Sequence, residues 1–162
     1  MLFLVKINLI AVGKVKEKYF LDGISEYAKR LSSYCNFKII EIEEENYKKV
    51  SPSLVEEIKS KEGKKILSSI DAKGYVFVTA IEGKQFSSTS FANEIKKLND
   101  SGVGVIYFII GGSYGLSDEV KKRADKLISF SDMTFPHTLF RLMLTEQIYR
   151  AFSINGGTPY HK

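Results

Sequence analysis

The segment that most constrains the fold is an almost uninterrupted apolar run at residues 103–110. A strand that is apolar on both faces must be covered on both faces, which is typical of parallel sheets with a helix layer on each side. Segments of strand character alternate with segments of helical periodicity along the rest of the chain. This alternation predicts an α/β domain with three layers and a mostly parallel sheet.

The apolar patterns place the individual elements. We expect strands at 4–12, 37–42, 75–79, 103–110 and, shorter, 127–131. We expect helices at 19–34, from Ser51-Pro52 to about residue 70, around 91–98, around 120–127 and at 137–153. Gly63 leaves open whether the second helix is continuous. The 162 residues contain no repeat, linker or break in composition, so we expect one domain spanning 1–162.

The last of these helices differs from the others because apolar residues cover nearly its whole circumference. Such a helix must be buried on more than one side, and in so small a domain the second side is expected to face another subunit. Its few polar residues must then be paired or functional. Glu146 and Arg150 are four residues apart and are spaced for an ion pair along the helix.

Composition excludes several classes of protein. The single cysteine, Cys35, rules out a disulfide framework and a multi-thiolate zinc site, so we expect no metal and a reducing cytoplasm. No apolar stretch is long enough for a membrane span, and Lys6 and Asn8 interrupt the apolar start, which is therefore no signal peptide. The net charge of +5 is compatible with a polyanionic partner but identifies none.

Ligands of parallel sheets bind beyond the carboxyl ends of the strands, which directs attention to the loops after Thr79, Ile110 and Ser131. The second loop carries Gly111, Gly112 and Gly115. These glycines let backbone approach a ligand closely, but the spacing is neither a dinucleotide fingerprint nor a P-loop. A tight turn between strand and helix explains them equally well.

Two further segments have a functional and a simpler explanation. The loop 131–136 and the following His137 can wrap a flat ligand, although a helix cap accounts for the same residues. The C-terminal tail follows two glycines and ends in Tyr160, His161 and Lys162, which can stack on a base and meet a phosphate. Free chain ends usually fray, and solvation alone explains the scattered basic clusters.

In order along the chain, four motifs resemble the RlmH-type methyltransferases of the SPOUT superfamily, which modify large-subunit ribosomal RNA. The resemblance covers the whole chain and includes the amino-terminal Ile10-Ala11-Val12-Gly13-Lys14. Its four motifs are Ile109-Ile110-Gly111-Gly112-Ser113-Tyr114-Gly115-Leu116-Ser117, Ser131-Asp132-Met133-Thr134-Phe135-Pro136-His137, Glu146-Gln147-Ile148-Tyr149-Arg150-Ala151 and Pro159-Tyr160-His161.

The resemblance implies S-adenosylmethionine as methyl donor and N3 of a pseudouridine in 23S rRNA as acceptor, on the assembled ribosome. It also implies a homodimer and a C-terminal trefoil knot, which general topology rules would not predict. Transferred position by position, the cofactor site comprises Ala80, Gly111, Gly112, Ser131, Asp132, Met133, Thr134, Phe135 and Pro136.

The resemblance also directs attention to four catalytic candidates. The base loses an imide proton, and a neutral imidazole is a suitable acceptor, so we expect His161 to act as base or base-orienter. His137 is the other histidine, and Tyr160 is expected to position the nucleobase. Arg141 either stabilises the developing imide anion, binds a phosphate, or forms an ion pair between subunits.

Three alternatives stay open. A non-catalytic RNA-binding protein would show no saturable binding of S-adenosylmethionine. A SPOUT methyltransferase acting on tRNA is disfavoured by the Pro-Tyr-His tail and by the lack of an added RNA-binding module. A nucleotide-dependent oxidoreductase is disfavoured by the missing dinucleotide fingerprint.

Overall fold

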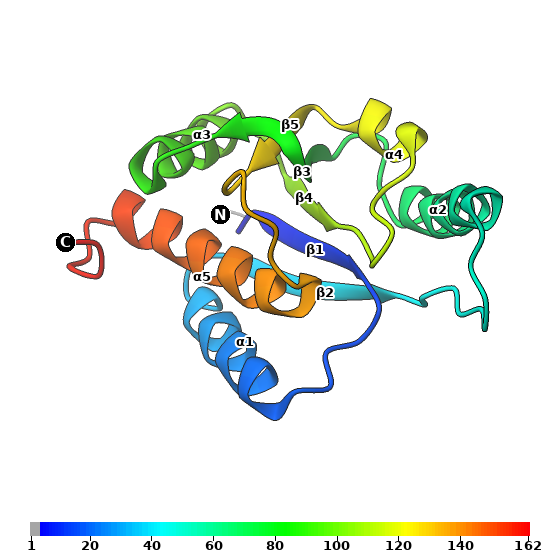
Figure 1. Ribbon diagram of the computed structural model, residues 1–162. Coiled ribbons are helices and arrows are strands. Elements are labelled where there is room, and N and C mark those ends of the chain that lie inside the picture. The colour runs from blue at the N-terminus through cyan, green and yellow to red at the C-terminus, as the bar shows by residue number, and fades with distance from the viewer. Residues whose placement is uncertain (1–3) are drawn as a thin grey trace.

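The computed structural model describes residues 4–162, which form a five-stranded sheet in the order β2-β1-β4-β3-β5 (Figure 1). Every neighbouring pair in the sheet is parallel. The expectation of a parallel sheet is thereby confirmed. The strands are β1 (Lys6–Val12), β2 (Asn36–Ile42), β3 (Tyr75–Gln85), β4 (Val105–Ile110) and β5 (Lys126–Ser129).

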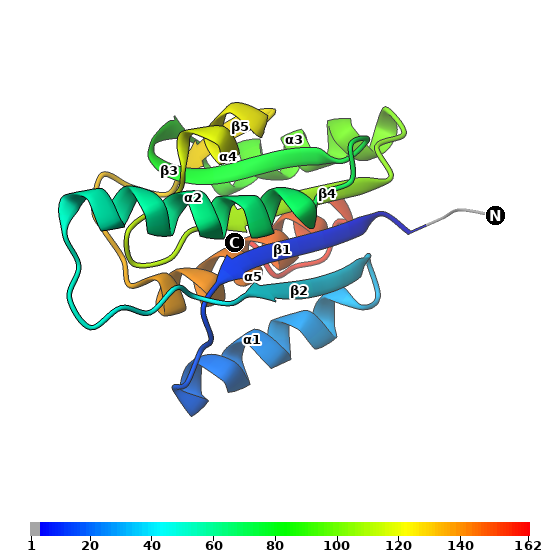
Figure 2. The ribbon, with the colours of Figure 1, turned by 90° about the vertical axis from the view of Figure 1, so that its right-hand side faces the viewer.

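Helices cover both faces of the sheet, which gives the three predicted layers (Figures 1 and 2). One face carries α1 (Lys18–Leu31), α3 (Ser88–Asp100) and α5 (His137–Asn155), and the other carries α2 (Pro52–Ser68) and α4 (Asp118–Arg123). None of these helices has both the length and the apolarity needed to cross a bilayer.

The central strands supply side chains to two separate cores. Leu9 of β1 and its partner Phe108 of β4 belong to the core under α1, α3 and α5. The next pair in the register, Ile10 and Ile109, belongs to the core under α2 and α4. Because successive side chains of a strand point to opposite faces, an apolar run is required here, as the sequence predicts.

The position of α5 changes the explanation of its apolar circumference. This helix lies between α1 and α3 and packs against both. The approach to α1 is close, since a Cβ added at Gly23 would lie 2.9 Å from Leu142 Cδ1. The flanks of α5 are therefore covered within one chain, and its composition alone does not require a second subunit.

The structure answers the question left open at Gly63 and shifts two element boundaries from their predicted positions. Gly63 does not interrupt α2; a Cβ there would lie 2.4 Å from Ser117 Oγ, so glycine permits the contact between α2 and the start of α4. The predicted helix at 120–127 was too long, because the chain becomes extended at Ala124 and Leu127 pairs in β5. Strand β3 continues past Thr79 to Gln85.

Candidate active site

Segments from the carboxyl ends of three strands, β3, β4 and β5, line a cavity of about 310 Å³. This volume lies at the lower end of the range of about 300–1,000 Å³ that is common for small-molecule sites. The lining residues come from β3, the loop after β4, α4 and the start of α5. They are Thr79, Ala80, Ile81, Glu82, Ile110, Gly111, Gly112, Gly115, Leu116, Lys121, Phe135, His137 and Phe140.

The glycine loop after β4 forms a tight turn that also walls this cavity. The amide of Gly115 donates to the carbonyl of Gly112 at 3.1 Å, and Gly115 has φ +84°, in the region that favours glycine. A Cβ at Gly111 would lie 2.9 Å from Leu116 Cγ, and one at Gly112 would lie 2.9 Å from Val12 Cγ1. Only glycine fits at these two positions without moving their neighbours, so bare backbone faces the cavity.

An irregularity in β3 forms another wall. Thr79 and Lys84 both pair with Ile128 of β5, so the four residues between them leave the ladder. Ala80 in this excursion lines the cavity, and Ile81 stands 57% exposed beside it. The loop after Thr79 that the sequence highlighted is thus a bulge within a longer strand.

The loop 131–136 encloses a second hollow of about 140 Å³. It shares Thr79, Ala80, Ile81, Phe135 and Phe140 with the first. Ser131 shapes the loop, because its Oγ accepts from the amide of Met133 at 3.0 Å. The side chain of Met133 is 74% exposed at the rim.

The two hollows together fit the chemistry of S-adenosylmethionine. The rings of Phe135 and Phe140 and the side chain of Leu116 offer apolar walls for a flat purine, and the glycine backbone leaves room for polar groups. Of the residues predicted to bind the cofactor, those lining the hollows are Ala80, Gly111, Gly112, Ser131, Met133, Thr134 and Phe135.

The other two residues predicted to bind the cofactor line neither hollow. Asp132 instead accepts from Gln85 Nε2 at 3.3 Å, and Pro136 is the N-cap residue of α5. Sequence reasoning missed several lining residues, including Leu116, Lys121 and Phe140. The first two follow a glycine loop that was itself identified, whereas Phe140 is one of many apolar residues in its helix and carried no signal.

Two of the predicted catalytic residues, His137 and Arg141, lie in α5 but have different surroundings. His137 lines the 310 Å³ cavity. Arg141 has a side chain only 3% exposed; its Nη1 lies 2.7 Å from Glu41 Oε2, and its Nη2 donates to the carbonyl of Gly13 at 3.0 Å. The ion pair of Arg141 thus lies within one chain, not between subunits, and its burial keeps the guanidinium from a phosphate.

The C-terminal tail curls back beside the C-terminal end of α5 (Figure 1). The hydroxyl of Tyr160 donates to Glu146 Oε1 at 2.9 Å and lies 3.3 Å from the hydroxyl of Tyr27. The predicted ion pair between Arg150 and Glu146 is present at 2.6 Å. The guanidinium of Arg150 lies 4.6 Å from the ring centroid of Tyr160 and contacts His161 Nδ1 at 3.2 Å.

This network keeps the tail away from the cavity of its own chain. Glu146 follows His137 by nine residues, which is about 13 Å along the axis of a helix. Burial raises the pKa of the Tyr160 hydroxyl, and its bonds to Tyr27 and Glu146 raise it further. The tyrosine therefore stays protonated and keeps donating to Glu146 at neutral pH.

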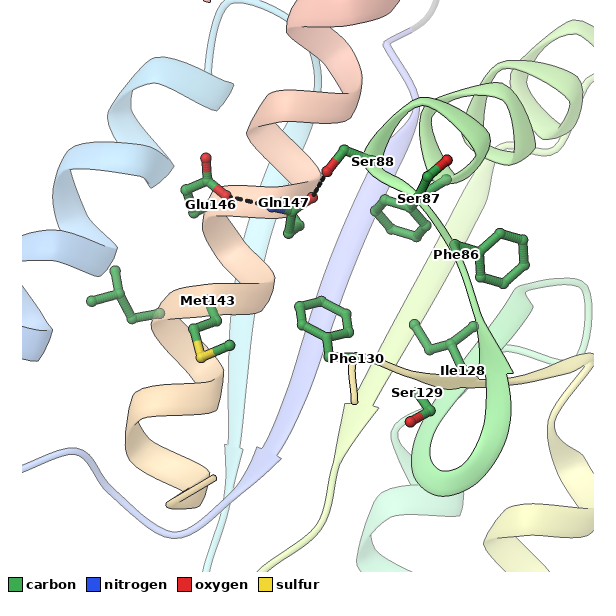
Figure 3. A pocket seen from close by; sticks show the side chains of 11 residues that line it. Phe86, Ser87, Ser88, Ile128, Ser129, Phe130, Met143, Glu146 and Gln147 are labelled. Atoms are coloured by element: carbon green, nitrogen blue, oxygen red, sulfur yellow. Dashed lines mark hydrogen bonds between the residues drawn. The ribbon is translucent and has the colours of Figure 1, made fainter. Parts of the chain in front are cut away.

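A third cavity, of about 410 Å³, lies between α3 and α5 beside this network (Figure 3). Gln147 closes one end, accepting from Ser88 Oγ at 2.9 Å and donating to Glu146 at 2.9 Å. The walls are mostly apolar and include Phe91, Phe130, Leu142 and Met143. No group of three His, Cys, Asp or Glu side chains in residues 4–162 is placed to bind a metal ion.

Comparisons with known proteins agree with the sequence motifs. A family model described as "Predicted SPOUT methyltransferase" matches residues 5–161. Proteins named "Ribosomal RNA large subunit methyltransferase H" from Lactobacillus johnsonii, Ligilactobacillus salivarius and Limosilactobacillus reuteri are each 54% identical to this chain over 157 residues. Each alignment covers 96% of this chain and 99% of the relative.

The match extends over every element that builds the cavities and over the tail, because it ends at residue 161. S-adenosylmethionine is the methyl donor of SPOUT methyltransferases, which agrees with the shape and chemistry of the two joined hollows. The resemblance inferred from the motifs is confirmed, and the chain belongs to the SPOUT methyltransferase family, among its large-subunit ribosomal RNA methyltransferases of type H.

Proposed function

We propose that this chain is a single-domain enzyme that transfers a methyl group from S-adenosylmethionine to N3 of a pseudouridine in 23S rRNA. The observation that carries the proposal is the 54% identity over 99% of the length of relatives named large-subunit rRNA methyltransferases. The substrate is the assembled ribosome, since residues 4–162 form one α/β sheet domain without a separate RNA-binding module among them. The enzyme therefore works in the cytoplasm, beside its substrate.

The cofactor occupies the two joined hollows. When bound, S-adenosylmethionine supplies a methyl group already activated by its sulfonium. The backbone of Gly111 and Gly112 and the loop 131–136 hold it, with Phe135 as an apolar wall. The main task left to the protein is to align the acceptor nitrogen with the methyl group and to accept the imide proton.

The tail supplies the remaining chemistry, with Tyr160 positioning the nucleobase and His161 acting as base or base-orienter. Within one chain the tail is held about 13 Å along α5 from His137, a distance that follows from nine helical residues. We infer that the tail serves the cavity of a partner chain in a homodimer. The open apolar cavity with Leu142 and Met143 beside the tail supports an interface at α5.

The same proposal includes the trefoil knot of the family. Strand β5 lies at the edge of the sheet, whereas α5 covers its centre between α1 and α3. The loop 131–136 must therefore cross the carboxyl edge of the sheet before α5 begins. This crossing supports a threaded C-terminal segment.

The test is transfer of tritiated methyl from S-adenosylmethionine to ribosomes from a strain that lacks this gene, with purified rRNA in parallel. We expect label in 23S rRNA only with intact ribosomes, and loss of transfer with retained cofactor binding in His161→Ala. Label in tRNA would identify a different substrate. Neither label nor cofactor binding would leave a non-catalytic RNA-binding protein, and full turnover of His161→Ala would exclude the role of His161.

A further inference from the structure

Residues 14–19, which comprise the end of the connection after β1 and the first residues of α1, carry exposed basic side chains. Lys14 and Lys16 are exposed, while Val15 between them is buried with 6% exposure. Glu17, which ends the connection, has extended backbone dihedrals of φ −70° and ψ 116°. Exposure thus alternates along residues 14–16, with both lysines facing solvent and Val15 anchoring the segment to the core.

No carboxylate among the described residues neutralises the charges of these two lysines. Neither forms an ion pair with any carboxylate in residues 4–162, whereas the neighbouring Lys18 lies 2.6 Å from Asp22. The carboxylate of Glu17 is engaged by the amide of Lys16 at 3.3 Å. Uncompensated ammonium groups of this kind bind phosphates and release the counterions of a nucleic acid.

An exposed aromatic ring follows directly. Tyr19, in the first turn of α1, is 68% exposed. The rings of Tyr19 and Phe20 are packed edge-to-face, with 4.4 Å between their centroids. An exposed ring next to free lysines is the arrangement with which proteins bind unpaired nucleotides, because the ring stacks on a base while the lysines contact the backbone.

The segment begins at the edge of the candidate active site. Gly13, which precedes it, accepts from Arg141 Nη2 at 3.0 Å. A Cβ added at Gly13 would lie 3.9 Å from Nε2 of His137, which lines the 310 Å³ cavity. The same point lies 3.4 Å from Glu44 Oε2, a carboxylate that also accepts from Ser113. An RNA strand that places a base at this cavity therefore passes close to Gly13, where this segment begins.

We propose that residues 14–19 form an RNA-binding surface for the unpaired nucleotides next to the target base, with Tyr19 stacking on one base and Lys14 and Lys16 contacting phosphates. This inference rests on the proposed rRNA methyltransferase function. It assigns substrate binding to a surface of the catalytic domain itself. The surface contacts the RNA equally in the ground state and in the transition state, so its loss raises KM and leaves kcat unchanged.

The test measures the kinetics of methyl transfer to large ribosomal subunits from a strain that lacks this gene. For Lys14→Ala/Lys16→Ala we expect KM for the subunits to rise about tenfold with kcat unchanged. The salt dependence of log KM should become shallower by about 1.4, because each single-strand phosphate contact contributes about 0.7. The matched control is Lys6→Ala/Lys73→Ala, which removes two exposed, unpaired lysines near the amino ends of β1 and β3.

For Tyr19→Ala we expect KM to rise about fivefold or more, with Tyr19→Phe like the wild type, because the ring provides the stacking. If the two double lysine variants raised KM equally, the loss of net charge alone would explain the effect, and the proposal would be overturned. A change of oligomeric state in Tyr19→Ala, seen by sedimentation, would also overturn it, since Tyr19 would then be an interface residue. A wild type without transfer would contradict the proposed function instead.

Discussion

Two glycines of the same chain illustrate how differently one residue type is constrained. A Cβ at Gly112 would lie 2.9 Å from Val12 Cγ1 and 3.4 Å from Glu62 Oε2, whereas one at Gly104 would meet nothing within 4 Å. Gly112 lines the candidate cofactor cavity beyond the carboxyl end of β4, whereas Gly104 lies just before the amino end of the same strand. The first is constrained by close packing and the second is not.

We therefore expect Gly112→Ala to weaken binding of S-adenosylmethionine by about tenfold or more, because the displaced loop forms the cavity wall. Gly104→Ala is the control and should bind as the wild type does. Titration calorimetry with the purified proteins measures both affinities. Unchanged affinity in Gly112→Ala would mean that the glycine loop is only a turn.

Glu62 of α2 is a buried carboxylate, with 3% of the residue exposed. Burial raises its pKa above the ordinary value, the neighbouring carboxylates of Glu44 and Glu45 raise it further, and a hydrogen bond from the amide of Glu45 opposes them. The folded state therefore holds this proton more tightly than the unfolded state does. Glu62 makes folding less favourable as the pH rises from the ordinary glutamate pKa through the raised one.

We expect Glu62→Gln to be more stable than the wild type at pH 8. The uncharged glutamine amide avoids the cost of holding a carboxylate in a buried position, and its oxygen can still accept from the amide of Glu45. At pH 4 the difference should shrink or reverse. Urea unfolding at the two pH values measures it, with the exposed Glu43→Gln as control. A glutamine variant less stable than the wild type at pH 8 would show that the carboxylate itself is stabilising.

At the scale of the elements, the contact between α2 and α4 depends on a residue that disfavours helices. Gly63 lies in the middle of α2, and a Cβ there would be 2.4 Å from Ser117 Oγ and 3.3 Å from Val120 Cγ2. Ser117 cannot move freely, because its hydroxyl caps α4 by accepting from the amide of Val120. The packing requirement therefore outweighs the intrinsic helix propensity.

Replacing Gly63 by alanine tests this balance. The substitution gains about 1 kcal/mol of helix propensity in an isolated helix, but overpacking costs about 1–3 kcal/mol. We expect a net loss of stability in thermal unfolding. Lys64→Ala, one exposed residue further along α2, should change little. A stabilised Gly63→Ala would mean that α4 shifts freely.

At the scale of the whole molecule, the proposal that tail and cavity come from different chains makes a quantitative prediction. In a dimer of Gly112→Leu and His161→Ala chains, one active site combines an intact cavity with an intact tail. Random pairing makes half of the dimers mixed, with one working site each, so about one quarter of wild-type activity should return. Each variant alone should be inactive.

The measurement is methyl transfer by the two differently tagged chains expressed together, before and after purification through both tags in succession. The doubly purified mixed dimer has one working site of two, so about half of wild-type activity is expected in it, against about one quarter in the unsorted mixture. The control is a mixture of the two separately purified variants under conditions in which the dimers do not exchange subunits. A mixed dimer as inactive as its parents would mean that the tail serves its own chain. It would then have to leave Glu146 and move along α5.

The sequence by itself determined the layers and the family. The apolar run of β4 is stable only when other elements bury both of its faces. The motifs that identify the family are short local stretches, so they can be recognised without knowing which residues are in contact. The helix and strand signals placed each element close to its observed position. They misplaced ends such as that of α4, because Leu127 pairs with Val78 in the sheet, a contact between residues far apart in the chain.

Only the tertiary structure decided which residues meet. It placed Arg141 against Glu41, a hundred positions away, folded Tyr160 onto Glu146, and brought Phe140 into the cavity wall. Periodicity reports which face of an element is apolar, but a cavity, an ion pair or a docked tail depends on how separate elements pack. That packing is fixed by the fit of side chains across the whole domain, which no local pattern encodes.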